Sequence, residues 1–195
     1  MTDVNPKSEL HRDLQDARES LIWKLEGLSE YDRRRPMVPT GTNLLGLVKH
    51  VAIIESGYLG NTFGRPFDES LPWFADDAEV NGDLWATADE TSEQITGLYR
   101  RVWAHSDATV EQLGLDAVGH VPWWGDGNDV TLLRILVYVI AETNRHAGHA
   151  DIVRELLDGS VGWRKGDDNM PPGDKAWWES NRRRVERAAK EAGLS

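Results

Sequence analysis

The sequence predicts an all-α protein: a four-helix bundle with long aromatic-rich connections and a short C-terminal helix. Apolar residues recur at three- and four-residue spacing over four long segments, which is the pattern of amphipathic helices. Two connections between these segments are long, so neighbouring helices need not all be antiparallel. No stretch shows an apolar–polar alternation that would favour a sheet over this bundle.

The first helix is expected from Lys7 to Leu28. Its predicted buried stripe consists of Leu10, Leu14, Ala17, Leu21, Leu25 and Leu28. Gly27 and the polar run that follows it close the helix, and Pro36 with Pro39 prevents its continuation.

The second helix is expected to begin after an N-cap at Thr40 or Thr42 and to end near Gly60. Its predicted buried side carries Leu44, Leu47, Val48, Val51 and Tyr58. The loop after Gly60 contains Phe63, Phe67, Trp73 and Phe74, and so many aromatic residues predict an ordered loop that packs onto the bundle.

The third helix is expected from about Asp83 to about His105, with Leu84, Ala88, Thr91, Ile95, Leu98 and Val102 facing inward. A second long connection follows, from Ser106 to Asp129. It contains three glycines and a Pro-Trp-Trp run, and the sequence leaves open whether it holds a short strand or none.

The fourth helix is expected to start at an Asp129 N-cap and to end at a Gly159 C-cap. Residues 1–160 would then form the bundle. Residues 161–195 are expected to form a linker and a helix, from about Asp174 to Ala192, that packs on the same domain.

Composition excludes several classes of protein. A length of 195 residues suits one domain. The net charge of −11 argues against capture of nucleic acid. No apolar run could span a membrane and no signal-peptide core is evident at the N-terminus, so we expect a cytoplasmic protein without a membrane partner. The chain has no cysteine, so any thiol chemistry requires a thiol from solution.

The fourth predicted helix carries a cluster of candidate metal ligands. Glu142, His146 and His149 are spaced i, i+4 and i+7, and therefore project from one face, beside the apolar stripe. A carboxylate and an imidazole one turn apart can bind a divalent metal from one rigid helix. A simple hydrogen-bonded Glu–His pair would explain the same spacing, so a third ligand from elsewhere is needed.

His50 is the candidate for that third ligand, because it lies at the edge of the buried stripe of the second helix. With Glu142 and His146 it would give three nitrogen and oxygen ligands from two facing helices, which leaves room for water or substrate. A core-edge histidine bonded to a backbone carbonyl is the alternative. Glu55 and His149 are candidate catalytic bases, although Glu55 could instead pair with Arg145 or Arg154.

Aromatic residues in the second long connection suggest a binding pocket. Trp123 and Trp124 lie among proline, glycine and aspartate residues, and His120 lies beside them. Such residues either cover the end of the bundle or line the mouth of a pocket that binds an organic cofactor.

The sequence resembles the DinB-like superfamily of metal-binding bundles. Three blocks in the right order carry the resemblance: TNLLGLVKHVAIIESGYLGNTFG, which contains His50; HVPWWG; and ETNRHAGHADIVRELLDG, which contains Glu142 and His146. Glu142 stands where many members carry histidine. In this respect the sequence looks like the mycothiol-dependent maleylpyruvate isomerases, whose ligands on this helix are also Glu and His. His149 stands where many relatives carry glutamine.

The resemblance implies an up-down-down-up helix order and one divalent metal, usually zinc or nickel, bound by His50, Glu142 and His146. It also implies thiol chemistry, because relatives are isomerases that use mycothiol or S-transferases that join mycothiol or bacillithiol to electrophilic small molecules. Paired bundles of this size often dimerise, so a homodimer is a further expectation.

The first interpretation is therefore a metal-dependent thiol S-transferase or isomerase. Two alternatives stay open. One is a metal- or ligand-binding stress protein without turnover, and the other is a metal-dependent hydrolase with Glu55 or His149 as general base.

Overall fold

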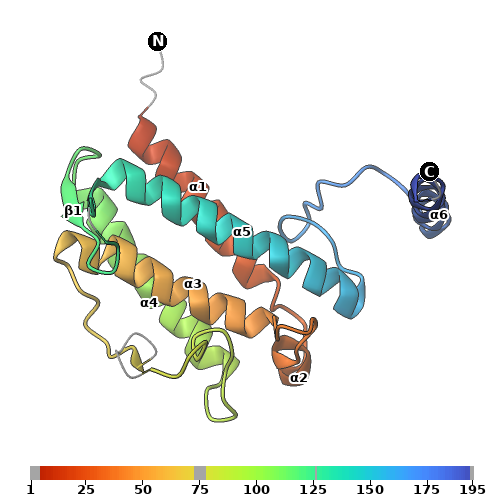
Figure 1. Ribbon diagram of the computed structural model, residues 1–195, viewed down its shortest axis with the longest axis horizontal. Coiled ribbons are helices and arrows are strands. Elements are labelled where there is room, and N and C mark those ends of the chain that lie inside the picture. Colours follow the sequence, from red (N-terminus) through yellow and green to blue (C-terminus); the bar gives the residue numbers. More distant parts are fainter. Residues whose placement is uncertain (1–4, 73–77, 126, 194–195) are drawn as a thin grey trace.

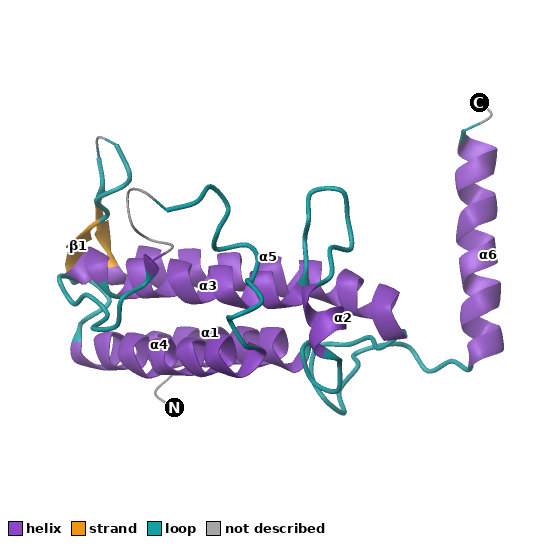
Figure 2. Cartoon of the chain, turned by 90° about the horizontal axis from the view of Figure 1, so that it is seen from below, coloured by secondary structure: helices purple, strands orange, loops and turns teal. Residues whose placement is uncertain are grey.

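A computed structural model describes residues 5–72, 78–125 and 127–193 (Figures 1 and 2). The elements along the chain are α1 (Pro6–Trp23), α2 (Glu30–Arg34), α3 (Leu44–Leu59), a 3-10 turn (Asn61–Phe63), α4 (Ser92–Gln112), β1 (Val118–His120), β2 (Asp129–Thr131), α5 (Leu132–Asp158) and α6 (Lys175–Ala192). The predicted all-α class is confirmed. None of the described helices is both long and apolar enough to cross a membrane.

Helices α1, α3, α4 and α5 form the bundle (Figure 1). Lys7 Nζ at the start of α1 donates to the carbonyl of Leu113 at the end of α4, 2.8 Å away, so these helices run in opposite directions. Arg154 near the end of α5 donates to the Lys24 carbonyl at the end of α1, so α1 and α5 run in parallel. Tyr58 near the end of α3 lies against Tyr138 near the start of α5, so α3 and α5 run in opposite directions. The up-down-down-up order is confirmed.

The predicted starts of α3 and α5 are wrong. Asn43, not Thr40 or Thr42, caps α3. Thr131, not Asp129, caps α5, because Asp129 pairs in a β-ladder two residues earlier. The predicted C-cap of α5 is confirmed, since Gly159 takes the left-handed conformation with φ 76°.

The start of α4 lies nine residues after the predicted Asp83. Thr91 and Gln94 form a capping box in which each side chain accepts from the other residue's backbone N–H, and this box fixes the first turn at Ser92. The preceding residues form turns instead, with the Gly82 N–H donating to the Glu79 carbonyl. Asp83 is therefore a loop residue beside the bundle.

The second connection does hold strands. Val118–His120 pairs antiparallel with Asp129–Thr131 in a small hairpin, and Gly119 lies opposite Val130. The short helix α2 was not expected from the sequence. Trp73 and Phe74, which were predicted to pack onto the bundle, lie outside the described residues.

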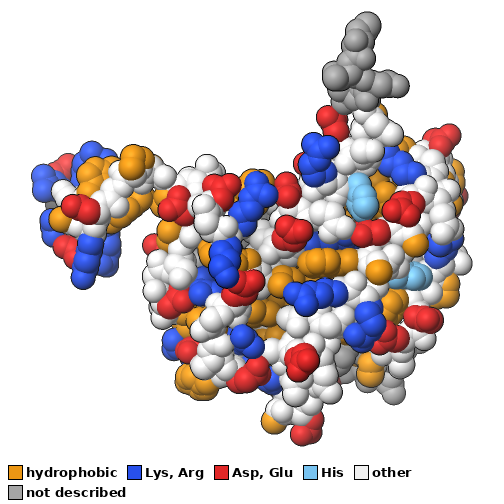
Figure 3. Space-filling view, turned by 180° about the vertical axis from the view of Figure 1, so that it is seen from behind, with side chains coloured by type: hydrophobic (Ala, Val, Ile, Leu, Met, Phe, Trp, Pro, Cys, Tyr) orange, Lys and Arg blue, Asp and Glu red, His pale blue; other side chains and the backbone are white. Residues whose placement is uncertain are grey.

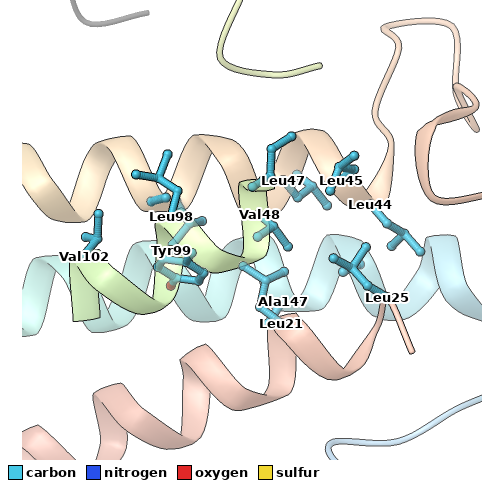
Figure 4. Close-up of a cluster of buried hydrophobic side chains, with 14 of the residues drawn as sticks. Leu21, Leu25, Leu44, Leu45, Leu47, Val48, Leu98, Tyr99, Val102 and Ala147 are labelled. Atoms are coloured by element: carbon cyan, nitrogen blue, oxygen red, sulfur yellow. The ribbon is translucent and has the colours of Figure 1, made fainter. Parts of the chain in front are cut away.

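The core has two halves along the bundle axis. One half, drawn in Figure 4, joins α1, α3, α4 and α5 through residues such as Leu21, Val48, Tyr99 and Ala147. The other half lies at the hairpin end and includes Leu14, Leu59, Val130 and Leu136. The polar groups described next lie on α3 and α5, beside these apolar side chains.

Helix α6 stands away from the bundle (Figure 2) and has no buried residue. Basic, acidic and hydrophobic side chains are all visible on it in the view of Figure 3. The expected packing of residues 161–195 on the bundle stays a prediction.

Candidate metal centre

Two neighbouring helices bring the three predicted metal ligands together. His50 lies on α3, and Glu142 and His146 lie one turn apart on α5. One ligand atom from each side chain lies within 4.8 Å of the other two. All three side chains are partly buried, with exposed fractions of 17%, 20% and 11%. The site is thus reachable from solvent but largely enclosed by the bundle.

The Glu142 carboxylate lies between the two imidazole rings. Its Oε1 is 3.0 Å from His146 Nε2 and 3.8 Å from His50 Nε2, so the second contact is too long for a direct hydrogen bond. The His50 and His146 rings meet edge to face, with centroids 4.8 Å apart. His146 Nδ1 is buried and has no hydrogen-bond partner within the described part of the chain.

Asp83 holds His50 in place. Its Oδ2 lies 2.6 Å from His50 Nδ1, which makes this nitrogen the proton donor and leaves Nε2 free to face Glu142. A carboxylate behind a histidine ligand fixes the ring orientation and raises the basicity of the ligating nitrogen. The sequence did not identify Asp83, because it reaches His50 only through tertiary structure.

Burial favours the metal-binding form of His146. Burial, followed by the charge of His50, lowers the pKa of His146, and this outweighs the opposing effect of Glu142. The neutral imidazole therefore predominates near pH 7, and this is the form that binds metals.

The donor set fits a divalent transition metal. Two imidazole nitrogens and one carboxylate oxygen are ligands that zinc and nickel accept. Ligand atoms around one tetrahedral zinc lie about 3.3 Å apart, given bond lengths of about 2.0–2.2 Å, and the spacing of the three side chains approaches this. The buried His146 Nδ1, which has no partner among the described residues, shows that hydrogen bonds of this part of the chain do not account for every polar atom of the cluster.

His149 does not join the three-ligand cluster. Its side chain is exposed, and its ring meets the His146 ring edge to face with centroids 5.4 Å apart. It therefore borders the site on the solvent side, where a catalytic role stays a prediction.

Glu55 is held in a buried ion pair outside the three-ligand cluster. Its carboxylate binds the guanidinium of Arg18 on α1 through two hydrogen bonds of 2.5 and 3.1 Å, and both side chains are fully buried. The predicted partners Arg145 and Arg154 are wrong: Arg145 is exposed and Arg154 binds Asp158. A carboxylate that is bound in this way is poorly placed to act as a base, and the catalytic role of Glu55 stays a prediction.

The two loop tryptophans form an aromatic cluster near the metal ligands. The indole N–H groups of Trp123 and Trp124 donate to the Tyr58 hydroxyl over 3.2 and 2.9 Å, and the Tyr138 ring lies against Tyr58. Tyr138 precedes Glu142 by one turn of α5. The hydrogen bond with Tyr58, together with burial, raises the pKa of Tyr138 to about 12, so the hydroxyl stays protonated near neutral pH.

His120 makes no ring contact with this cluster among the described residues, and it is linked to Trp124 only through Asn128. It is exposed on the hairpin, where Nδ1 contacts Asp129 at 3.0 Å and Nε2 contacts the Asn128 amide. The sequence placed it beside the tryptophans, but the strand directs its side chain to solvent.

Comparison with known proteins gives the same architecture. A conserved protein from Enterococcus faecalis, known from a crystal structure, superposes with a TM-score of 0.60 at 15% identity, covering 80% of this chain and 99% of its own. This likeness concerns the fold. No match was found among curated proteins.

The family of this chain follows from a match between its bundle sequence and a protein family. Residues 9–159 match the family described as Mycothiol-S-transferase, and this range includes His50, Glu142 and His146. The match confirms the resemblance to DinB-like proteins and covers most of the chain. The chain therefore belongs to the mycothiol-S-transferase family.

Proposed function

We propose that this protein is a divalent-metal-dependent S-transferase that joins a low-molecular-weight thiol of the mycothiol type to an electrophilic small molecule. The observation that carries the proposal is the convergence of His50, Glu142 and His146 across α3 and α5. Family membership supplies the reaction class. The absence of cysteine means that the reacting thiol has to come from the cosubstrate.

A metal ion held by these three side chains would lower the pKa of a bound thiol and keep it as a reactive thiolate. The single carboxylate in the ligand set leaves a divalent ion with net positive charge, which suits an anionic sulfur ligand. Zinc or nickel fits the two imidazoles best.

The protein side chains would hold and enclose the reactants. Asp83 fixes the His50 ring so that Nε2 faces the site. The aromatic cluster of Tyr58, Trp123, Trp124 and Tyr138 lies next to the ligands and offers apolar surface with hydroxyl groups. Such a surface suits the organic part of a thiol cosubstrate or of its acceptor. We expect the protein to act in the cytoplasm, where thiols stay reduced.

The other interpretations receive less support. Hydrolysis needs a base beside bound water, and Glu55 is held by Arg18. An isomerase that uses the same thiol shares the metal chemistry and differs in its acceptor. Metal binding without turnover would leave the aromatic cluster without a role.

A conjugation assay tests the proposal. Metal-loaded protein is incubated with monochlorobimane and mycothiol, bacillithiol or glutathione, and the fluorescent conjugate is followed. We expect mycothiol or bacillithiol to be conjugated faster than without protein, and His146→Ala to return the rate to background. His120→Ala is the matched control, because that histidine lies outside the site. A rate that the His146 substitution leaves unchanged would contradict the proposal.

A further inference from the structure

We propose that Arg134, Tyr138 and Arg145 on α5 form a subsite beside the metal ligands that binds a carboxylate of the electrophilic acceptor. These three residues are called the rim subsite below. The inference rests on the proposed S-transfer and names the class of acceptor that the site would take. It follows from the direction of the hydrogen bonds in the aromatic cluster and from the positions of the two arginines on α5.

The hydrogen bonds of the aromatic cluster run toward Tyr138. The indole N–H groups of Trp123 and Trp124 both donate to the hydroxyl oxygen of Tyr58. A hydroxyl oxygen accepts two hydrogen bonds and donates one. The Tyr58 proton is therefore left for the Tyr138 hydroxyl, its hydrogen-bond partner, whose ring lies 4.7 Å from that of Tyr58 between centroids. Tyr138 accepts in this pair, so its own proton is available to another group.

The Tyr138 hydroxyl is a donor that a ligand can reach. The Tyr138 side chain is 37% exposed, whereas Tyr58 behind it is 4% exposed. Donors that follow one another in a chain polarise each other, which strengthens the last donor. A ligand atom that meets the Tyr138 hydroxyl is therefore an acceptor, such as a carboxylate oxygen, and not a second donor.

Two arginines add positive charge to this donor. Arg134 precedes Tyr138 by four residues and Arg145 follows it by seven, so at 100° per residue the three side chains leave α5 within about 40° of one another. The Arg134 guanidinium lies over the Trp124 ring, 5.6 Å from its centroid, and the Tyr138 ring contacts the same indole. Arg145 lies close enough for its charge to act on the Tyr138 hydroxyl.

The guanidinium groups of Arg134 and Arg145 have no carboxylate partner among the residues that the structure describes. The chain carries 33 acidic residues against 22 basic ones, and the buried Arg18 and Arg154 are both held by carboxylates. A guanidinium presents N–H donors in a planar fork that matches a carboxylate. Two such groups beside a hydroxyl donor form a subsite that presents donors only, and an anionic oxygen group satisfies it.

The rim subsite borders the metal ligands and does not include them. Glu142 follows Tyr138 by one turn, and Arg145 immediately precedes His146. In the proposed reaction the thiolate sulfur forms a bond to the electrophilic carbon, and the leaving group departs with the bonding electrons. A carboxylate elsewhere on the acceptor takes no part in this exchange. Its binding at the rim would fix which end of the acceptor faces the sulfur.

A matched pair of acceptors tests the rim subsite. The probes are para-(chloromethyl)benzoate and para-(chloromethyl)benzamide, which share a reacting carbon and a chloride leaving group and differ in charge. Conjugation to mycothiol by metal-loaded protein is measured for both and divided by the uncatalysed rate. We expect kcat/KM to favour the benzoate about tenfold, the effect of a hydrogen bond to a charged group. Equal normalised values for the two acceptors would overturn the proposal.

Variants separate binding at the rim from a structural role. Tyr138→Phe, and Arg134→Gln with Arg145→Gln, should each raise the KM for the benzoate about tenfold and leave its kcat and both constants for the benzamide unchanged. Arg182→Gln is the control, because it removes one exposed arginine on α6, outside the bundle. A loss that is equal for both acceptors would overturn the proposal, since the rim would then serve the thiol or the fold.

A binding measurement keeps this test independent of turnover. Metal-loaded protein is titrated by calorimetry with para-methylbenzoate and para-methylbenzamide, which lack a leaving group. We expect the benzoate to bind more tightly and the double arginine variant to lose this preference. Protein that binds in this way but conjugates neither chloromethyl probe would support the rim subsite and contradict the proposed S-transfer. A preference that survives the arginine substitutions would overturn the rim subsite, because the carboxylate would then bind elsewhere.

Discussion

Helix α3 contributes to two clusters of titratable side chains. They differ in whether the protein itself supplies a partner for each charged or polar group. Glu55 faces Arg18 in a fully buried pair, and the charges and hydrogen bonds balance within the protein. His50 faces Glu142 and His146 in a partly exposed cluster where the buried His146 Nδ1 has no partner within the described part of the chain. The first cluster is complete as folded, whereas the second has the ligand set that the proposed cation would bind.

The difference shows which polar groups serve stability and which serve function. Burial alone would lower the pKa of Arg18, but the Glu55 carboxylate offsets burial and the pKa is raised. Glu142 offsets the burial of His146 only in part, and the pKa of His146 falls. Ion pairing thus favours the charged form of Arg18, whereas burial favours the neutral form of His146, which is the form that binds a metal.

The largest expected effect is on the stability of the protein when the Arg18–Glu55 pair is broken. Arg18→Met would leave the Glu55 carboxylate buried without its partner, and breaking a buried pair costs about 3–5 kcal/mol. Denaturant unfolding of metal-free protein measures the loss. The double variant Arg18→Met with Glu55→Met should lose less than the single variant. Equal stability of Arg18→Met and the unmodified protein would show that the pair contributes nothing.

The next effect is on the metal affinity of the cluster of His50, Glu142 and His146. Asp83→Ala removes the carboxylate behind His50, and the loss of such a partner typically weakens binding about 10–100-fold. Competition with a chelator measures the affinity. Asp129→Ala is a matched control, because it removes the carboxylate behind the exposed His120. If both variants bind metal equally well, Asp83 does not position the ligand.

The smallest effect concerns pH. The pKa of His146 is lowered in the folded protein, so the unfolded chain takes up this proton first as the pH falls below about 6.5. The contribution of this group to stability is complete above that pH and is lost as the pH falls toward the folded pKa. Thermal unfolding of metal-free protein between pH 7.5 and 5 checks the direction, with His146→Gln as control. A shallower loss in that variant is expected, and a steeper one would contradict the assignment.

The sequence predicted the bundle because four helices have clear apolar stripes. It predicted His50, Glu142 and His146 because a helix fixes the spacing of ligands and the family resemblance supplied the partner helix. The predicted start of α4 is too early, because Leu84 and Ala88 continue the apolar spacing of the helix toward the N-terminus. In the structure these residues form turns, and the Thr91–Gln94 capping box starts the helix after them.

Other contacts depend on tertiary structure that spacing does not show. Asp83 reaches His50 across 33 residues, from a loop. The Glu55 partner was assigned to the wrong helix, although Arg18 lies within the apolar stripe of α1 between Leu14 and Leu21. An arginine at such a buried position was the available signal for an internal carboxylate.

Metal analysis of the purified protein tests the central claim most directly. We expect close to one equivalent of a divalent metal, zinc or nickel, in the unmodified chain and in His120→Ala, and only background in His50→Ala and His146→Ala. A folded, unmodified protein that binds no divalent metal, or a His50→Ala variant that binds it as well, would contradict the account.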